Sequence, residues 1–203
     1  SMLESIFVVA LFLLYMLLWK VKKIQQKRVT GINPEVMGES TSNVQQFMSH
    51  FTNFLTVYAA IVILIHATNF QWESLFSRYP LLSSSKVDVM GFFVGLFGLS
   101  ICLYAQIKMG SSWRVGIDEK VKTQLITTGL YKFVRNPTYL GLFLLNMGVW
   151  LIWPTWTVFL LNILFILFLE IQVRCEEDYL SVVHGTEYRE YKKRTKRYVP
   201  FIY

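Results

Sequence analysis

Apolar runs close to 20 residues long recur along this chain of 203 residues. A helix rises 1.5 Å per residue, so about 20 apolar residues cross the roughly 30 Å hydrocarbon core of a bilayer. Inside lipid the backbone must satisfy its own hydrogen bonds, and the sequence has no strand-like alternation that would suit a barrel. We therefore predict an all-α integral membrane protein. Its five transmembrane helices are expected at residues 3–19, 51–68, 87–107, 139–153 and 156–171.

The ends of these runs indicate how the helices are connected. The first run follows the single acid Glu4 and ends in a basic cluster without a small-residue cleavage site, so we expect a retained span rather than a signal peptide. Only Trp153, Pro154 and Thr155 separate the fourth run from the fifth. These two helices should form a tight hairpin with tryptophan at the bilayer interface.

The basic residues are divided very unevenly between the two ends of the predicted helices. Of 20 Lys and Arg residues, 18 follow the first span, lie between the third and fourth, or follow the fifth, and only Arg78 and Lys86 lie on the other side. The positive-inside rule places the N-terminus outside and the C-terminus in the cytoplasm. This asymmetry and the anionic lipid headgroups explain the net charge of +7, so no nucleic-acid partner is expected.

Several classes of functional site are disfavoured by what the sequence lacks. The two cysteines and three histidines are scattered and match no metal or redox motif. There is no phosphate-binding glycine loop, zinc-protease motif or nucleophilic serine motif. Asn146 and Asn162 are the main polar residues of the last two spans, and we interpret them as interhelical hydrogen bonds rather than as a transport path. A metal site, a hydrolase and a transporter are therefore poor interpretations.

The glycines of the third span and the polar residues between the first two spans have structural interpretations. The third span contains Gly91, Gly95 and Gly98, a spacing typical of closely packed membrane helices. Residues 30–46 are polar, with Gly, Pro and Ser, and are expected to be a flexible connector.

Most of the polar pattern falls in two predicted cytoplasmic segments, residues 108–136 and 172–203. Each is too short to form a core of its own, so both should pack on the helix ends and on each other. A site there would suit one soluble and one lipophilic reactant. We interpret residues 1–203 as a single membrane domain, with residues 108–203 as its functional core and residues 1–86 as N-terminal helices and connectors.

The first block, GLYKFVRNPTYLG at residues 129–141, lies directly before the fourth span. Pro137 suits the first turn of a helix, where its missing N–H costs nothing. Asn136 stands at the N-cap, where its side chain can accept from the amides of the next turn. Taken alone, the block is explained as a helix start with Arg135 as an anchor.

The second block, RCEEDYLSVVHGTEYREYKKR at residues 174–194, extends the fifth helix beyond the bilayer. Residues four apart share a helix face, so Gln172 should lie beside Glu176. Residues 186–197 predict a second short helix that carries Tyr188 and Tyr191 on one side and ends before Pro200. Its simplest role would be to lie on the lipid headgroups.

Together the two blocks resemble the isoprenylcysteine carboxyl methyltransferases, integral membrane enzymes that methylate a C-terminal prenylcysteine with S-adenosylmethionine. The resemblance covers residues 113–203, and the helix layout is similar to that of the compact prokaryotic members. The residues that carry it are Gly129, Tyr131, Arg135, Pro137, Tyr139 and Gly141, then Glu176, Glu177, Gly185, Glu187, Tyr188, Tyr191 and Lys192, and finally Pro200, Phe201 and Ile202.

The resemblance implies a cytoplasmic cofactor pocket formed by the loop before the fourth helix and the C-terminal helical segment. The cofactor-binding residues it implies are Gln124, Leu125 and Ile126 at the adenine and ribose, Tyr131 beside them, Asn136, Pro137, Thr138 and Tyr139 near the amino-acid end, and Glu176 as the acidic contact. Weaker candidates for substrate binding are Gln172, Arg174 and Glu177. The acceptor would be a lipophilic small molecule or a prenylated peptide presented from the bilayer, and no metal is implied.

Two positions depart from the family pattern. Asn136 replaces the usual histidine, so it can donate a hydrogen bond but cannot titrate near neutral pH. Gln172 stands where better-studied members have an arginine, and Arg174 is rotated about half a turn away from that position.

Methyl transfer to a carboxylate needs no acid or base, because this nucleophile is already ionised at neutral pH. We therefore expect no catalytic dyad, and rate enhancement by alignment and desolvation. Three alternatives remain open. A phospholipid amine N-methyltransferase would need a base such as Glu177. A sterol-type membrane reductase would bind NADPH. A helical scaffold or lipid-binding protein would catalyse no reaction.

Overall fold

The computed structural model describes residues 2–68 and 75–203, and within these residues all regular secondary structure is helical. The six α-helices are α1 (Met2–Thr30), α2 (Asn43–Ala67), α3 (Ser85–Met109), α4 (Pro137–Ile152), α5 (Trp156–Val183) and α6 (Gly185–Arg194). Short 3₁₀ turns occupy Met37–Glu39, Pro80–Leu82, Gly110–Ser112 and Gly129–Lys132. The predicted all-helical fold is confirmed for the described residues.

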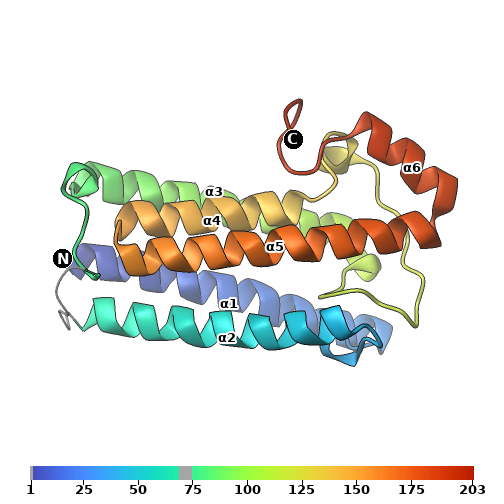
Figure 1. The fold of residues 1–203 in the computed structure, drawn as a ribbon, viewed down its shortest axis with the longest axis horizontal. Coiled ribbons are helices and arrows are strands. Elements are labelled where there is room, and N and C mark those ends of the chain that lie inside the picture. The colour runs from blue at the N-terminus through green and yellow to red at the C-terminus, as the bar shows by residue number, and fades with distance from the viewer. Residues whose placement is uncertain (1, 69–74) are drawn as a thin grey trace.

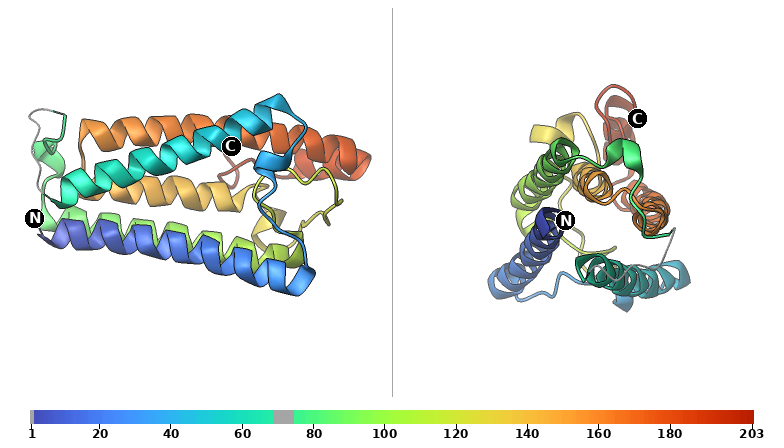
Figure 2. Two further views of the ribbon diagram at one scale, coloured as in Figure 1. Left: turned by 90° about the horizontal axis from the view of Figure 1, so that it is seen from below. Right: turned by 90° about the vertical axis from the view of Figure 1, so that its left-hand side faces the viewer.

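The five long helices run side by side along the longest axis of the molecule, and α6 lies at one end (Figure 1). Viewed end-on, α3, α4 and α5 lie together, with α1 packed against α3 and α2 against α5 (Figure 2). By length and composition α1, α2, α3 and α5 could each cross a membrane, whereas α4 is a shorter apolar helix of 16 residues. Each predicted span falls largely within one of the five helices, and α1 and α5 continue for about three turns beyond their predicted spans.

The contact between α3 and α4 depends on glycine in both helices. A Cβ added at Gly91 would lie 2.7 Å from the carbonyl oxygen of Gly148, and one added at Gly98 would meet the carbonyl oxygen of Gly141. Gly95 faces Leu11 of α1 at the same short range. The prediction of close helix packing at these glycines is therefore confirmed.

The turn between α4 and α5 is as short as predicted. Thr155 caps α5 by accepting a hydrogen bond from the amide of Val158 at 3.3 Å. Asn162 donates from Nδ2 to the carbonyl oxygen of Asn146 at 3.0 Å, which joins the two helices within the apolar layer. The predicted interhelical hydrogen bond is confirmed for Asn162, whereas the Asn146 side chain donates to the carbonyl oxygen of Leu142 in its own helix.

Two expectations about connecting segments are wrong. The connector between α1 and α2 is not a free loop: the amides of Val36 and Met37 both donate to the carbonyl oxygen of Val115, and Met37 is buried. Helix α6 ends at Arg194, so Pro200 does not terminate it. In both places contacts with distant parts of the chain decide the local conformation, and such contacts leave no pattern in the local sequence.

Candidate functional site

A cavity of about 250 Å³ lies at the end of the helix bundle that carries α6. Its walls come from the loop after α3, the start of α4, the second half of α5, and α6. All nine residues predicted to bind the cofactor line it: Gln124, Leu125, Ile126, Tyr131, Asn136, Pro137, Thr138, Tyr139 and Glu176. The fold thus brings residues 124–139 and Glu176 of α5 to the wall of one cavity. Their role in cofactor binding remains a prediction.

Glu176 projects from α5 to the cavity wall, where its contacts within the described structure are with neutral groups. The Tyr139 hydroxyl donates to its Oε1 at 2.7 Å, and Gln172 donates from Nε2 to the same atom at 3.0 Å. Gln172 in turn exchanges two hydrogen bonds with Gln45 of α2, at 2.9 and 3.0 Å. The predicted pairing of Gln172 with Glu176 is confirmed, and the pair of glutamines fixes α2 against this wall.

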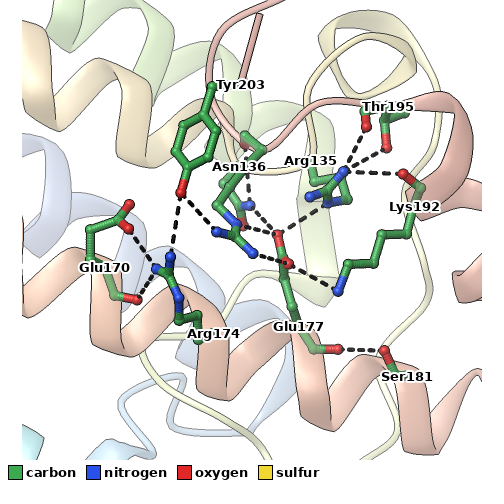
Figure 3. A network of polar contacts seen from close by, with 10 residues as sticks. Arg135, Asn136, Glu170, Arg174, Glu177, Ser181, Lys192, Thr195 and Tyr203 are labelled. Atoms are coloured by element: carbon green, nitrogen blue, oxygen red, sulfur yellow. Dashed lines mark hydrogen bonds and ion pairs between the residues drawn. The ribbon is translucent and has the colours of Figure 1, made fainter.

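Glu177, the next residue of α5, points about 100° away from Glu176 around the helix and does not line the cavity. Its carboxylate is 2% exposed and lies 3.1 Å from Arg135 Nε, 3.1 Å from Arg197 Nη2 and 3.5 Å from Lys192 Nζ. These contacts, shown in Figure 3, fasten the segment after α6 to the start of α4. We call Glu177, Arg135, Arg197 and Lys192 the clasp. Glu177 therefore lies outside the cavity among three cations, and a substrate-binding role for it remains a prediction.

Arg174 also lies outside the cavity. Its side chain is half exposed and pairs with Glu170 at 2.5 Å, one turn earlier on the same face of α5. Of the three weaker candidates for substrate binding, only Gln172 lines the cavity. The helical rotation between Gln172 and Arg174 accounts for this difference.

Asn136 occupies the N-cap of α4, as predicted, but its side chain makes no capping hydrogen bond. Instead Nδ2 donates to Glu177 Oε1 at 3.1 Å and to the carbonyl oxygen of Arg197 at 3.3 Å. Both partners are acceptors, so the amide nitrogen must face them. The expectation that the Asn136 side chain caps the helix is therefore wrong, although Asn136 holds the N-cap position and lines the cavity.

Two cavity residues that the sequence analysis did not single out shape the loop after α3. Asp118 accepts hydrogen bonds from the amides of Lys120 and Val121, both at 3.0 Å, and forms an ion pair with Arg114 at 2.7 Å. Burial alone would raise the pKa of Asp118, but these hydrogen bonds lower it below its ordinary value. Aspartate followed by a turn is the local signal that could have identified this loop anchor.

Helix α6 turns both of its tyrosines inward. Tyr191 is buried and its hydroxyl donates to the carbonyl oxygen of Tyr131 at 2.6 Å. Tyr188 is 1% exposed, and both rings line the cavity. The interpretation of this helix as a segment that only lies on lipid headgroups is therefore wrong.

A second, apolar cavity of about 130 Å³ lies beside the first, between α1, α2, α4 and α5. The residues that line both cavities are Tyr15, Thr52, Leu142, Phe165 and Phe168. The first cavity, which we call the polar cavity because the charged residues Arg135 and Glu176 line it, therefore lies beside an apolar one inside the bundle. Within residues 2–68 and 75–203, no group of three His, Cys, Asp or Glu side chains is arranged to hold a metal ion.

Comparisons with known proteins agree with the resemblance seen in the two motifs. Residues 87–187 match a family model described as phospholipid methyltransferase. The chain is 27% identical to protein-S-isoprenylcysteine O-methyltransferase of Dictyostelium discoideum, over 70% of this chain and 61% of that protein. It is 34% identical to the Homo sapiens enzyme of the same name, over 57% of this chain and 42% of that protein. The chain thus spans about two fifths to three fifths of the curated relatives it matches.

The fold has a solved counterpart. The structure of the eukaryotic intramembrane Ras methyltransferase ICMT, determined without a monobody, superposes with a TM-score of 0.66 at 18% identity. The match covers 98% of this chain and 68% of that one. The family resemblance predicted from residues 113–203 is confirmed, and the likeness of fold extends over the N-terminal helices as well.

Proposed function

We propose, on the premise that this chain belongs with the isoprenylcysteine O-methyltransferases, that it transfers a methyl group from S-adenosylmethionine to a lipophilic acceptor. The C-terminal carboxylate of a prenylcysteine is the first candidate acceptor, because the curated relatives are named for it. The observation that carries the proposal is that the polar cavity shares five lining residues with an apolar cavity, so that a soluble cofactor and a membrane-borne acceptor could meet there.

The residues of the polar cavity fit this cofactor chemically. Glu176 offers a carboxylate that is not paired with a cation in the described structure, which suits the hydroxyl or ammonium groups of the cofactor. The tyrosine rings of Tyr131 and Tyr139 offer faces that attract a sulfonium. Bound there, S-adenosylmethionine would supply an electrophilic methyl group.

The protein's own contribution would be positioning and exclusion of water. A carboxylate acceptor is ionised at neutral pH, so no side chain has to remove a proton. Glu176 is held at its wall by Tyr139 and Gln172, and the start of α4 is held by the clasp. Fixed walls of this kind favour alignment of the acceptor with the methyl group and strip water from the carboxylate.

We further propose that all five long helices cross the bilayer, with the N-terminus outside and the cavity at the cytoplasmic face. The 18 basic residues on that side support this orientation. Residues 108–203 would then be the methyltransferase core, and residues 1–86 would supply the N-terminal helices and connectors. Cysteine labelling at Ser83 and at Ser181, in intact vesicles with an impermeant reagent, tests the orientation. Labelling of Ser181→Cys from outside would contradict it.

The activity is tested with purified full-length protein in lipid nanodiscs and radiolabelled S-adenosylmethionine. N-acetyl-S-farnesylcysteine and phosphatidylethanolamine are offered separately as acceptors. We expect transfer to the farnesylated carboxylate, and we expect Glu176→Gln to reduce it at least tenfold. Binding of NADPH without binding of S-adenosylhomocysteine would instead identify a reductase.

The second candidate acceptor is a phospholipid amine, and one observation favours it. At the position of Gln172, beside Glu176, better-studied relatives have an arginine. A neutral amide there offers no positive charge to bind the carboxylate of an acceptor. An amine must lose a proton during transfer. Glu176 could accept it, whereas Glu177 is enclosed in the clasp and is unsuited to be the base. Transfer to phosphatidylethanolamine alone would select this candidate.

A further inference from the structure

Tyr188 carries a hydroxyl group that the protein itself does not satisfy. The side chain is 1% exposed, and its oxygen has no hydrogen-bond partner within the described residues. Tyr191, three residues later on the same helix, donates to a carbonyl oxygen. Leaving a buried hydroxyl without a partner is costly, so native proteins rarely keep one without a reason. Since Tyr188 lines the polar cavity, a bound ligand could provide the missing partner.

Arg135 lines the same cavity, and one of its guanidinium nitrogens, Nη2, has no hydrogen-bond acceptor among the described residues. Its side chain is 8% exposed, its Nε contacts Glu177, and its Nη1 donates to the carbonyl oxygens of Lys192 and Thr195. No contact of Nη2 with another described residue accompanies these, as Figure 3 shows for the residues drawn there. Arg135 and Tyr188 both line the cavity, and each carries a donor that no described residue satisfies.

One cation of the clasp reaches the cavity. Arg135 lines it, whereas Glu177, Arg197 and Lys192 do not. Burial, and next the charge of Glu177, raise the pKa of Tyr188 above its ordinary value, so the hydroxyl stays protonated at physiological pH and acts as a donor. Hydrogen bonds from an arginine and a neutral hydroxyl to an ionised acceptor are among the stronger ones in proteins.

We propose that the Tyr188 hydroxyl and Nη2 of Arg135 form a carboxylate-binding subsite in the polar cavity. The inference rests on the proposed function, and it adds α6 to the binding machinery. Two reactants of the proposed reaction carry a carboxylate: the amino-acid end of the cofactor, and the prenylcysteine acceptor. The same pair of donors would recognise either one, and binding measurements can tell them apart.

The experiment uses the full chain in nanodiscs and the variant Tyr188→Phe. Calorimetry compares S-adenosylhomocysteine with 5′-methylthioadenosine, which lacks the carboxylate, and N-acetyl-S-farnesylcysteine with its methyl ester. If the subsite holds the cofactor, Tyr188→Phe weakens binding of S-adenosylhomocysteine by roughly tenfold to a hundredfold and leaves 5′-methylthioadenosine unchanged. If it holds the acceptor, the same loss appears for the farnesylated acid and not for its ester.

The control is Tyr191→Phe, which removes a neighbouring hydroxyl that already has a protein partner. Without ligand, Tyr188→Phe should unfold at the same temperature as the wild type or a higher one, whereas Tyr191→Phe should unfold at a lower one. Unchanged binding of 5′-methylthioadenosine shows that the variant site is folded.

Two failures are distinguishable. If the wild type binds S-adenosylhomocysteine but Tyr188→Phe binds both carboxylates as tightly as the wild type, the subsite is refuted and the proposed function stands. If the wild type does not bind S-adenosylhomocysteine at all, the proposed function is refuted together with the subsite.

Discussion

Two regions on either side of α5 treat neighbouring carboxylates in opposite ways. On one side Glu177 is enclosed by Arg135, Arg197 and Lys192 and joins the segment after α6 to the start of α4. On the other side Glu176 lines the cavity, held by the neutral groups of Tyr139 and Gln172. A buried carboxylate surrounded by cations holds structure together, whereas one left without a cation is available to a ligand.

The first and largest effect should come from Glu177→Gln. Removing one partner of a buried ion pair leaves the other uncompensated, so we expect the free energy of unfolding to fall by about 3–5 kcal/mol. Denaturant unfolding in detergent, followed by tryptophan fluorescence, measures this. A loss below about 1 kcal/mol would mean that the clasp contributes little to stability.

Glu176→Gln should separate function from stability. The amide can still accept from Tyr139, so we expect the free energy of unfolding to change by less than about 1 kcal/mol. Loss of the charge should reduce affinity for S-adenosylhomocysteine by roughly tenfold or more, because a charged hydrogen bond contributes about 1.5–3 kcal/mol. If this variant instead unfolds as readily as Glu177→Gln, the contrast between the two sides of α5 is wrong.

Gln45→Leu tests the support behind Glu176. The change leaves the buried Gln172 amide without its partner on α2, which should cost about 1–3 kcal/mol of stability. We also expect weaker ligand binding, since Gln172 would no longer be fixed beside Glu176. Thermal unfolding with and without S-adenosylhomocysteine measures both effects. Wild-type stability would show that the glutamine pair is not needed.

The smallest effect should come from Arg174→Ala. Its ion pair with Glu170 is exposed, and such pairs contribute about 0–1 kcal/mol. We expect stability within that range and an unchanged affinity for both reactants. A tenfold loss of affinity for the acceptor would show that Arg174 takes part in acceptor binding, contrary to its position outside the cavity.

Particular residues show which features of the fold and the site could be predicted from the sequence. The apolar runs were correctly interpreted as helices, and the glycines of α3 and Asn162 of the α4–α5 hairpin as helix contacts, because apolar surroundings and close packing impose local requirements on residue type. The two motifs also led to nine residues that the fold gathers around one cavity. Asp118 and Arg114 were overlooked, since an ion pair in an irregular loop has no periodicity to find.

The sequence by itself determined that this chain forms apolar helices with a polar end, and which family motifs that end carries. Only the tertiary structure decided that Glu176 and not Glu177 faces the cavity, that Asn136 donates to the clasp and not to its own helix, and that Tyr188 points inward. The physical reason is rotation: adjacent residues on a helix point about 100° apart, and the neighbours packed against each direction come from distant parts of the chain.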